Sequence, residues 1–250
     1  MEKTEKERFK FGLVGKAISY SFSRGYFDEK FKNLNLSSHS YENFDLDTIN
    51  EISELLTNTA HLKGLNVTIP YKEDVIPYLD SIDKSAKEIG AVNTIKIVNK
   101  KLKGYNTDAY GFETSLEPFL KNSHKNALIL GTGGASKAIA YVLNKLKIHF
   151  KFVSRSGKNN GFTYDDLNAD IVKAHTLIIN CSPVGTFPDI DKKPKIPYTG
   201  ISEKHLLYDL IYNPEKTAFL SAGEKQGAQI CNGLRMLELQ AEKAWEIWNE

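Results

Sequence analysis

The first hundred residues alternate short apolar runs with segments whose apolar side chains recur every three or four positions. The apolar runs predict β-strands at residues 11–15, 39–44 and 62–69. The helical spacing predicts helices at residues 25–34, 49–56 and 82–89. Two further runs, 92–98 and 102–105, predict a hairpin. Strands that alternate with helices are typical of an α/β domain with a largely parallel sheet.

The same pattern restarts after a polar joint, His124-Lys125-Asn126. A helix over 107–120 leads to the joint, and strands are predicted beyond it at 127–130, 149–153, 177–179 and 206–210, with a helix at 137–146. The last segment has apolar residues at positions 234, 237, 241, 244, 245 and 248, the spacing of an amphipathic helix. We therefore predict two α/β domains that meet near residues 106–126.

Composition narrows the class of protein. The chain has 250 residues, of which 41% are hydrophobic and 26% charged, with a formal net charge of +2. These values are ordinary for a globular protein and give no reason to expect nucleic acid or a membrane as partner. Cys181 and Cys231 lack metal-ligand spacing, so we expect no metal. The charged start has no apolar signal segment, which indicates a cytoplasmic protein.

A glycine-rich turn, Gly131-Thr132-Gly133-Gly134-Ala135-Ser136, lies between a predicted strand and a predicted helix. Gly131 permits the tight turn, and Gly133 lets the backbone approach a pyrophosphate without a Cβ in the way. The helix that follows offers free N–H groups and the positive end of its dipole to phosphates. Ser136 occupies the third fingerprint position, usually glycine or alanine. The turn predicts a Rossmann-like, doubly wound dinucleotide-binding domain.

The end of the next strand, Ser154-Arg155-Ser156, indicates which dinucleotide is bound. An NAD-binding domain would normally have Asp or Glu here to bind the ribose 2′-hydroxyl. The Arg155 guanidinium suits a 2′-phosphate, through forked, charge-assisted hydrogen bonds. The alternative interpretation is that Arg155 is a solvated arginine at a strand end. Because a glycine turn precedes it in the same predicted domain, we interpret Arg155 as a residue that favours NADP.

Three motifs upstream have polar side chains that could bind and convert a small substrate. The first is Ser19-Tyr20-Ser21-Phe22-Ser23, whose hydroxyls can donate to one carboxylate, although serines are common in turns. The second is Asn66-Val67-Thr68-Ile69-Pro70-Tyr71-Lys72, a strand that ends at a proline. The third is Gly104-Tyr105-Asn106-Thr107-Asp108 at the domain junction. None of the six histidines lies in these motifs.

Lys72 and Asp108 are therefore the titrating groups available for proton transfer. Burial would lower the pKa of a lysine from about 10.4 towards working pH, while a nearby aspartate would oppose that shift. The sequence leaves open whether Lys72 is an acid/base or a fixed hydrogen-bond donor. Each residue also has a structural interpretation, Lys72 as a surface lysine and Asp108 as a helix-start acid.

Taken together, the motifs resemble those of shikimate dehydrogenase. They occur in the same order as in that family and extend from about Phe11 to Ala241. The matching pieces are Ser21-x-Ser23, Asn66-Val67-Thr68-x-Pro70-x-Lys72, Ala91-Val92-Asn93-Thr94, Gly104-x-Asn106-Thr107-Asp108, the glycine turn, Ser154-Arg155-Ser156, Asn180-Cys181-Ser182-Pro183-Val184-Gly185, Tyr208-Asp209-Leu210-Ile211-Tyr212-Asn213-Pro214, and residues 232–241. Such an ordered set is highly specific, whereas one motif alone would be weak.

The resemblance implies the division of the chain and its reaction. Residues 1–105 would form the substrate-binding domain, residues 106–233 the NADP-binding domain, and helix 234–250 would pack back on the first, with the active site in the cleft between them. The implied reaction is the reversible NADPH-dependent reduction of 3-dehydroshikimate to shikimate in chorismate and aromatic amino-acid biosynthesis. Shikimate and 3-dehydroshikimate would be the ligands of a monomer or homodimer.

The resemblance also implies a role for each site residue. Ser21 and Ser23 would hold the substrate carboxylate, with Tyr212 close to it, and Lys72 would form the catalytic pair with Asp108. Ring hydroxyls or the carbonyl would be bound by Asn66, Thr68, Asn93, Asp108 and Gln240. NADP would be bound by Gly131, Gly133, Gly134, Ala135, Ser154, Arg155 and Ser156, with Gly233 and Met236 beside the nicotinamide.

The chain departs from the family pattern in its serine turn. Ala17 and Arg24 stand where the family usually has proline, and Tyr20 replaces histidine. Fewer prolines should make the loop less rigid and weaken substrate affinity. Two rival functions remain, a relative that uses quinate or an amino analogue of shikimate, and a binding module without chemistry. Arg155 speaks against an NAD-linked quinate enzyme, and intact Lys72 and Asp108 against the module.

Overall fold

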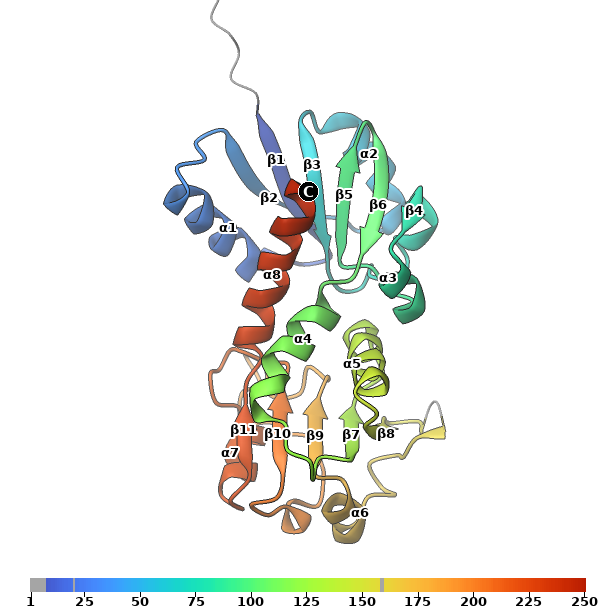
Figure 1. The fold of residues 1–250 in the computed structure, drawn as a ribbon, viewed down its shortest axis with the longest axis vertical. Helices are drawn as coiled ribbons and strands as arrows, with labels where there is room; N and C mark the ends of the chain where they lie inside the picture. Colours follow the sequence, from blue (N-terminus) through green and yellow to red (C-terminus); the bar gives the residue numbers. More distant parts are fainter. Residues whose placement is uncertain (1–7, 20, 158–159) are drawn as a thin grey trace, which may run out of the picture. The chain divides into compact units, whose positions relative to one another are not determined.

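The chain forms two compact units (Figure 1). The computed structural model describes residues 8–19, 21–157 and 160–250. The first unit comprises Met1–Thr107 and Ala241–Glu250, and the second comprises Asp108–Gln240. The chain thus passes between the units after Thr107 and again after Gln240, inside its last helix. The sequence predicts these two boundaries at residues 105 and 234.

The first unit is built on a six-stranded sheet in the order β2-β1-β3-β5-β6-β4. The strands are β1 (Phe9–Gly15), β2 (His39–Asp45), β3 (Leu62–Val67), β4 (Ser81–Ile82), β5 (Thr94–Val98) and β6 (Lys101–Tyr105). The helices are α1 (Phe22–Asn33), α2 (Ile52–Asn58), α3 (Lys84–Ile89) and the last turns of α8 (Leu234–Asn249), with short 3-10 turns at Ile49–Glu51 and Ile76–Tyr78. All the strands predicted here are confirmed, and β4 was missed.

This first sheet is mixed because β5 runs against its neighbours, and the prediction of a largely parallel sheet holds for its other strands. β1 runs parallel to β2 and β3, while β5 runs antiparallel to both β3 and β6. The predicted hairpin of β5 and β6 is confirmed, and it reverses at Asn99 and Lys100. Their φ angles of 49° and 64° fit a two-residue turn whose twist matches the strands it joins.

Aromatic side chains hold α1 and the end of α8 on one face of the first sheet. The Trp248 ring stacks on Phe11 at 4.8 Å between centroids, and its indole N–H donates to the Ile95 carbonyl at 3.0 Å. A Cβ on Gly64 would overlap the same indole, so the strand needs glycine there. Phe27 and Phe31 of α1 complete this cluster. The end of the chain is therefore part of the first unit's core.

The second unit is a five-stranded sheet in the order β11-β10-β9-β7-β8, with every pair parallel. Its strands are β7 (Asn126–Leu130), β8 (His149–Val153), β9 (Leu177–Asn180), β10 (Leu206–Asp209) and β11 (Gln229–Cys231). Its helices are α4 (Asp108–Leu116), α5 (Gly134–Lys145), α6 (Ala169–Ala174), α7 (Ala218–Glu224) and the start of α8, with 3-10 turns at Glu117–Phe119 and Tyr198–Gly200. The prediction of a Rossmann-like, doubly wound domain is confirmed, although α6, α7 and β11 were missed.

Helices cover both faces of this parallel sheet, which explains why its strands are apolar throughout. Leu207 packs in one cluster with Phe219 and Leu220 of α7. The next residue, Tyr208, points to the opposite face. There its ring meets the Phe112 ring of α4 edge-on at 5.1 Å, and its hydroxyl lies 2.7 Å from that of Ser115.

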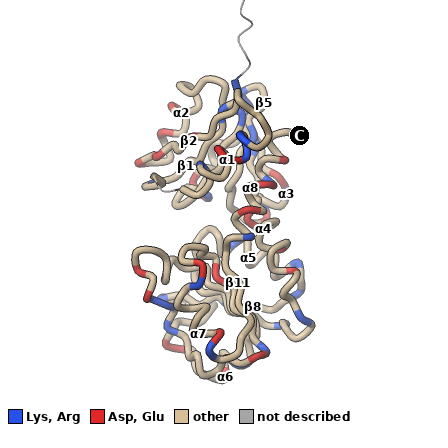
Figure 2. The backbone as a smooth tube through the Cα atoms, turned by 90° about the vertical axis from the view of Figure 1, so that its left-hand side faces the viewer, with Lys and Arg blue, Asp and Glu red and all other residues tan. Residues whose placement is uncertain are grey.

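Charged residues of both signs are interspersed over each unit (Figure 2). Basic and acidic side chains are thus mixed locally, and they are nearly equal in number over the whole chain, whose formal net charge is +2. Among the described residues, every helix is too short or too polar to cross a bilayer.

Candidate active site

The glycine turn has the backbone that a dinucleotide site requires. Gly131 has a φ of 113°, which favours glycine, and a Cβ there would lie 3.2 Å from the Cys181 backbone. Gly133 is the N-cap of α5 and has no atom within 4 Å of its Cβ position, so open space lies over it. A ligand phosphate can therefore approach this backbone and the N–H groups of the first helical turn.

The unusual third residue of the fingerprint has a structural role. The Ser136 hydroxyl donates to the Gly133 carbonyl oxygen at 2.6 Å, and its backbone N–H donates to the same oxygen at 2.9 Å. Ser136 is buried, so its side chain faces the turn rather than solvent. Serine at this position thus fixes the turn and leaves the phosphate space above Gly133 open.

Parallel pairing brings the other predicted NADP residues to the same edge of the sheet. Leu130 pairs with Val153 in β8, so the carboxyl ends of β7 and β8 lie together. The Gly131 N–H donates to the Val153 carbonyl at 2.8 Å, directly before Ser154, Arg155 and Ser156. Ser154 is buried, while Arg155 and Ser156 are exposed. The guanidinium is thus accessible beside the glycine turn.

Three more predicted residues of the second unit, Tyr212, Gly233 and Met236, follow β10 and β11 at this edge. Tyr212 is half-buried and comes two residues after the Leu210 N–H, which donates to the Asn180 carbonyl at the end of β9. Gly233 donates to the Ile211 carbonyl at 3.1 Å, and a Cβ on it would overlap Leu210. Met236, one turn further in α8, is buried.

A buried carboxylate that the sequence did not single out holds this edge together. Asp209 is fully buried and accepts hydrogen bonds from the Asn180 amide at 3.0 Å, the Thr217 hydroxyl at 2.6 Å and the Ile211 N–H at 3.1 Å. Burial raises the pKa of Asp209 to about 6. Its place in the Tyr208–Pro214 motif was the signal that could have identified it.

In the first unit, the serine turn starts α1. Ser21 is the N-cap, and its hydroxyl oxygen accepts from the Ser23 N–H at 3.2 Å. The loop before it is held by Asp45, whose carboxylate accepts from the N–H groups of Ala17 at 2.7 Å and Ile18 at 3.3 Å. Ala17 has a φ of 55°, which proline cannot adopt, so this loop is fixed by a carboxylate where the family pattern has a proline. Tyr20 lies outside the described residues.

The second motif ends β3 next to the start of β5. Asn66 pairs with Thr94 in the sheet, and its amide nitrogen donates to the Asn93 carbonyl at 3.3 Å and the Thr94 hydroxyl at 3.2 Å. Asn93 is buried, and its side-chain oxygen accepts from the Thr107 N–H at 2.7 Å. Thr68 continues the strand, with its N–H donating to the Val14 carbonyl at 2.9 Å.

Lys72 is partly buried, one residue after the buried ring of Tyr71. Its carbonyl accepts from the Val92 N–H at 2.7 Å, which ties the lysine to the segment that ends in Asn93. The first unit therefore gathers six predicted residues around the carboxyl ends of β1 and β3. They are Ser21, Ser23, Asn66, Thr68, Lys72 and Asn93.

Three other predicted residues belong to the second unit: Asp108, Tyr212 and Gln240. Asp108 is the first residue of α4 and is 2% exposed. It follows Thr107, whose N–H and hydroxyl are both bound to the Asn93 side chain, so the backbone that leads into α4 is anchored in the first unit. Gln240 is the last α8 residue of the second unit and is half-buried.

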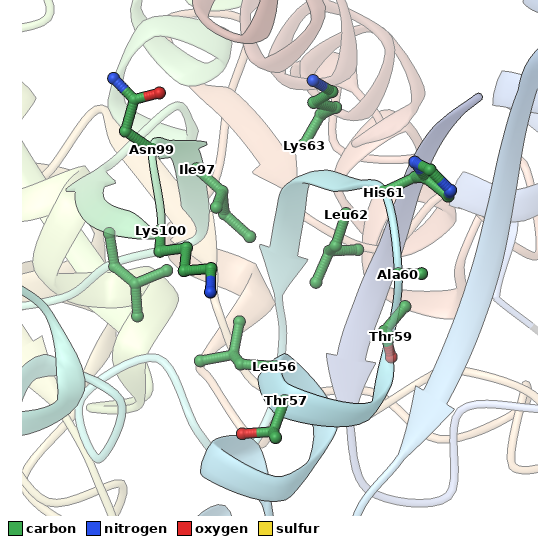
Figure 3. Close-up of a pocket in the computed structure, with 11 residues that line it drawn as sticks. Leu56, Thr57, Thr59, Ala60, His61, Leu62, Lys63, Ile97, Asn99 and Lys100 are labelled. Carbon is green, nitrogen blue, oxygen red and sulfur yellow. The ribbon is translucent and has the colours of Figure 1, made fainter. Parts of the chain in front are cut away.

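A surface pocket of about 670 Å³ lies at the other end of β3 (Figure 3). The side chains of Leu56, Leu62 and Ile97 converge on it, and Lys100 stands at its rim. It starts where β3 begins, whereas Asn66 and Thr68 lie where the strand ends. The pocket is therefore separate from the predicted substrate residues.

The chain is similar to known proteins over nearly its whole length. Residues 13–95 match the family model described as the shikimate dehydrogenase substrate binding domain. A shikimate dehydrogenase (NADP(+)) from Methanococcus maripaludis is 39% identical over 256 residues, covering 95% of this chain and 90% of its own.

Solved structures give the same result for the fold. Shikimate dehydrogenase 1 from Peptoclostridium difficile is 36% identical and superposes with a TM-score of 0.82, covering 96% of this chain and 92% of its own. The Thermus thermophilus shikimate 5-dehydrogenase, solved in complex with NADP(H) and shikimate, is 28% identical with a TM-score of 0.85, covering 96% and 93%. With identity of this level over nearly the whole length and the same two-sheet fold, the chain belongs to the shikimate dehydrogenase family.

Proposed function

We propose that this chain catalyses the reversible NADP-dependent interconversion of shikimate and 3-dehydroshikimate. The observation that supports this most directly is the gathering of Ser21, Ser23, Asn66, Thr68, Lys72 and Asn93 at one end of the first sheet. The set combines neutral hydroxyl and amide groups with one amine. That chemistry suits a small ring that has one carboxylate and several hydroxyl groups.

In this proposal the polar groups divide the substrate between them. Ser21 and Ser23, with Tyr212, bind the carboxylate. Asn66, Thr68, Asn93 and Gln240 bind ring hydroxyls or the carbonyl. Hydrogen bonds from several fixed groups orient the ring, so that only one of its hydroxyl carbons faces the reacting partner.

Lys72 and Asp108 form the catalytic pair. A bound NADP would supply the hydride acceptor for the hydroxyl-bearing carbon, and its reduced form the hydride donor for the ketone. In the oxidation the neutral amine of Lys72 would take the hydroxyl proton, and in the reduction its ammonium would supply a proton or a fixed hydrogen bond to the ketone oxygen. Asp108 is the acidic member of this proposed pair.

The second unit holds the cofactor. Gly131, Gly133, Gly134 and Ala135 bind the pyrophosphate, Ser154, Arg155 and Ser156 bind the 2′-phosphate, and Gly233 and Met236 border the nicotinamide. The open space over Gly133 and the exposed guanidinium beside it fit this group. The bound NADP(H) of the Thermus thermophilus relative supports the same choice of cofactor.

The direct test is a panel of rates with shikimate and quinate, each with NADP and NAD, followed by absorbance of the reduced nicotinamide. We expect shikimate with NADP to give the highest kcat/KM. Preference for quinate with NAD would contradict the proposal, and the absence of turnover with every pair would indicate a binding module instead.

Variants of Lys72 and Arg155 test the assigned roles. Lys72→Ala should lower kcat by at least about 100-fold, the usual range for a lost general acid/base, and leave the Kd of NADP unchanged. Lys84→Ala, an exposed lysine in the same unit, is the control. Arg155→Ala should weaken the binding of NADP but not of NAD, and Lys151→Ala, in the strand that precedes Arg155, should affect neither. Equal losses for both cofactors would exclude the 2′-phosphate role.

We also propose that the enzyme works in the cytoplasm as a monomer or homodimer. Size-exclusion chromatography with light scattering tests the assembly, and a stable higher oligomer would contradict it.

A further inference from the structure

A tyrosine outside the predicted site is hydrogen-bonded to one of its residues. Tyr41 lies on β2, and its ring is buried against Phe27 at 4.6 Å between centroids and 11° between planes. Its hydroxyl donates to the side-chain oxygen of Asn66 at 2.8 Å.

The hydrogen bonds of Asn66 fix the direction of its amide. Both protons of its nitrogen are used, one towards the Asn93 carbonyl at 3.3 Å and one towards the Thr94 hydroxyl at 3.2 Å. Its oxygen accepts from Tyr41 and, within the described part of the chain, keeps one lone pair. A flipped amide would turn its oxygen towards the Asn93 carbonyl oxygen, which can only accept, whereas the Tyr41 hydroxyl can either donate or accept. The amide therefore has only one favourable orientation.

The acceptors of this amide are themselves held in place. The Thr94 hydroxyl donates to the Asn93 side-chain oxygen at 3.1 Å, and that oxygen also accepts from the Thr107 N–H at 2.7 Å. Thr94, Asn93 and Thr107 are all buried. A buried and satisfied network of this kind is rigid, because each broken bond would leave a polar group without a partner.

We propose that Tyr41 is a positioning residue that holds the Asn66 oxygen as a hydrogen-bond acceptor towards the substrate, while the Asn93 carbonyl fixes the direction of the amide. Asn66 is half-exposed, so its remaining lone pair is accessible to a ligand. It then binds a ring hydroxyl, which can donate, and cannot donate to a ketone or carboxylate. This inference rests on the proposed function, because it takes Asn66 as a substrate residue. It adds which group of the substrate Asn66 recognises and which residue holds the Asn66 oxygen in place.

The test is Tyr41→Phe, which keeps the ring against Phe27 and removes only the hydroxyl. We expect the KM for shikimate to rise about 3- to 10-fold, the loss typical of one neutral hydrogen bond, with kcat within about two-fold of wild type and the Kd of NADP unchanged. Tyr78→Phe is the matched control, because the Tyr78 hydroxyl donates to the Asn50 side-chain oxygen at 2.6 Å on the surface of the same unit.

Substrate analogues separate positioning from a general structural role. Tyr41→Phe should weaken the binding of shikimate but not that of the one analogue that lacks the hydroxyl bound by Asn66. An equal loss for all three analogues that lack a single ring hydroxyl, or a parallel fall in kcat and Tm, would overturn the inference. Unchanged KM in a variant of an active enzyme would also overturn it while leaving the proposed function intact. Absence of shikimate turnover by the wild type would instead overturn the proposed function, and the inference with it.

Discussion

Replacing Gly133 by alanine should weaken the binding of NADP while leaving the stability of the fold nearly unchanged. Gly133 has φ and ψ of −79° and 178°, which alanine adopts without strain, and no atom lies within 4 Å of the added Cβ. We therefore expect the free energy of unfolding to change by less than about 1 kcal/mol, the range for substitutions at a helix N-cap.

The same methyl group would occupy the space through which a pyrophosphate reaches the start of α5. Hydrogen bonds to a charged group contribute about 1.5–3 kcal/mol each, so losing one corresponds to about a 10- to 100-fold rise in the Kd of NADP. The measurements are NADP binding by calorimetry and unfolding by urea, on the same preparations of wild type and variant.

Two other glycines provide controls. A Cβ on Gly25 in α1 also meets open space, so Gly25→Ala should leave the Kd of NADP unchanged and stabilise the helix slightly. Gly131→Ala should destabilise the protein itself, because its φ of 113° is strained for alanine. A folded Gly133→Ala variant that binds NADP within two-fold of wild type would refute the phosphate site over Gly133.

Two further predictions concern stability. Ala17→Pro should lower the free energy of unfolding by about 1–3 kcal/mol, although the family usually has proline there, because proline cannot adopt the φ of 55° and lacks the N–H that donates to Asp45. A urea midpoint at or above that of wild type would disprove this. Asp209 has a pKa raised by burial to about 6, so its contribution to stability is complete below about pH 4 and is lost as the pH rises through 6. Asp209→Asn has no such titration, and its stability relative to wild type should rise by up to about 3 kcal/mol between pH 4 and 7 in urea unfolding; a constant difference would show that Asp209 does not titrate there.

Local sequence was sufficient for the nucleotide turn. A buried strand, two glycines with different tasks and a helix follow one another within about twenty residues, and the contacts that fix the start of the helix are close in the sequence. Ser136 is an example, since its hydroxyl bonds a carbonyl only three residues away. The periodicities likewise identified the longer strands and helices, because each buries one face or one stripe continuously.

The short elements and the antiparallel pairing of β5 with β3 were not predictable in this way. α6 has six residues and β11 three, too few for a periodic pattern to stand out. The antiparallel direction of β5 depends on which strand it pairs with, and its neighbour β3 is about thirty residues earlier. Pairing of this kind is a tertiary choice that the local pattern does not encode.

The sequence by itself determined the two α/β domains, the dinucleotide turn and, through ordered motifs, the shikimate dehydrogenase family. Only the tertiary structure decided how the polar residues are oriented: Asp45 fixes the serine turn from 28 residues away, and the Asn93 carbonyl and the Tyr41 hydroxyl hold the Asn66 amide from 27 and 25 residues away. The physical reason is that motifs record which groups are present. The direction in which a hydroxyl or an amide points is set by the partners that the fold places beside it.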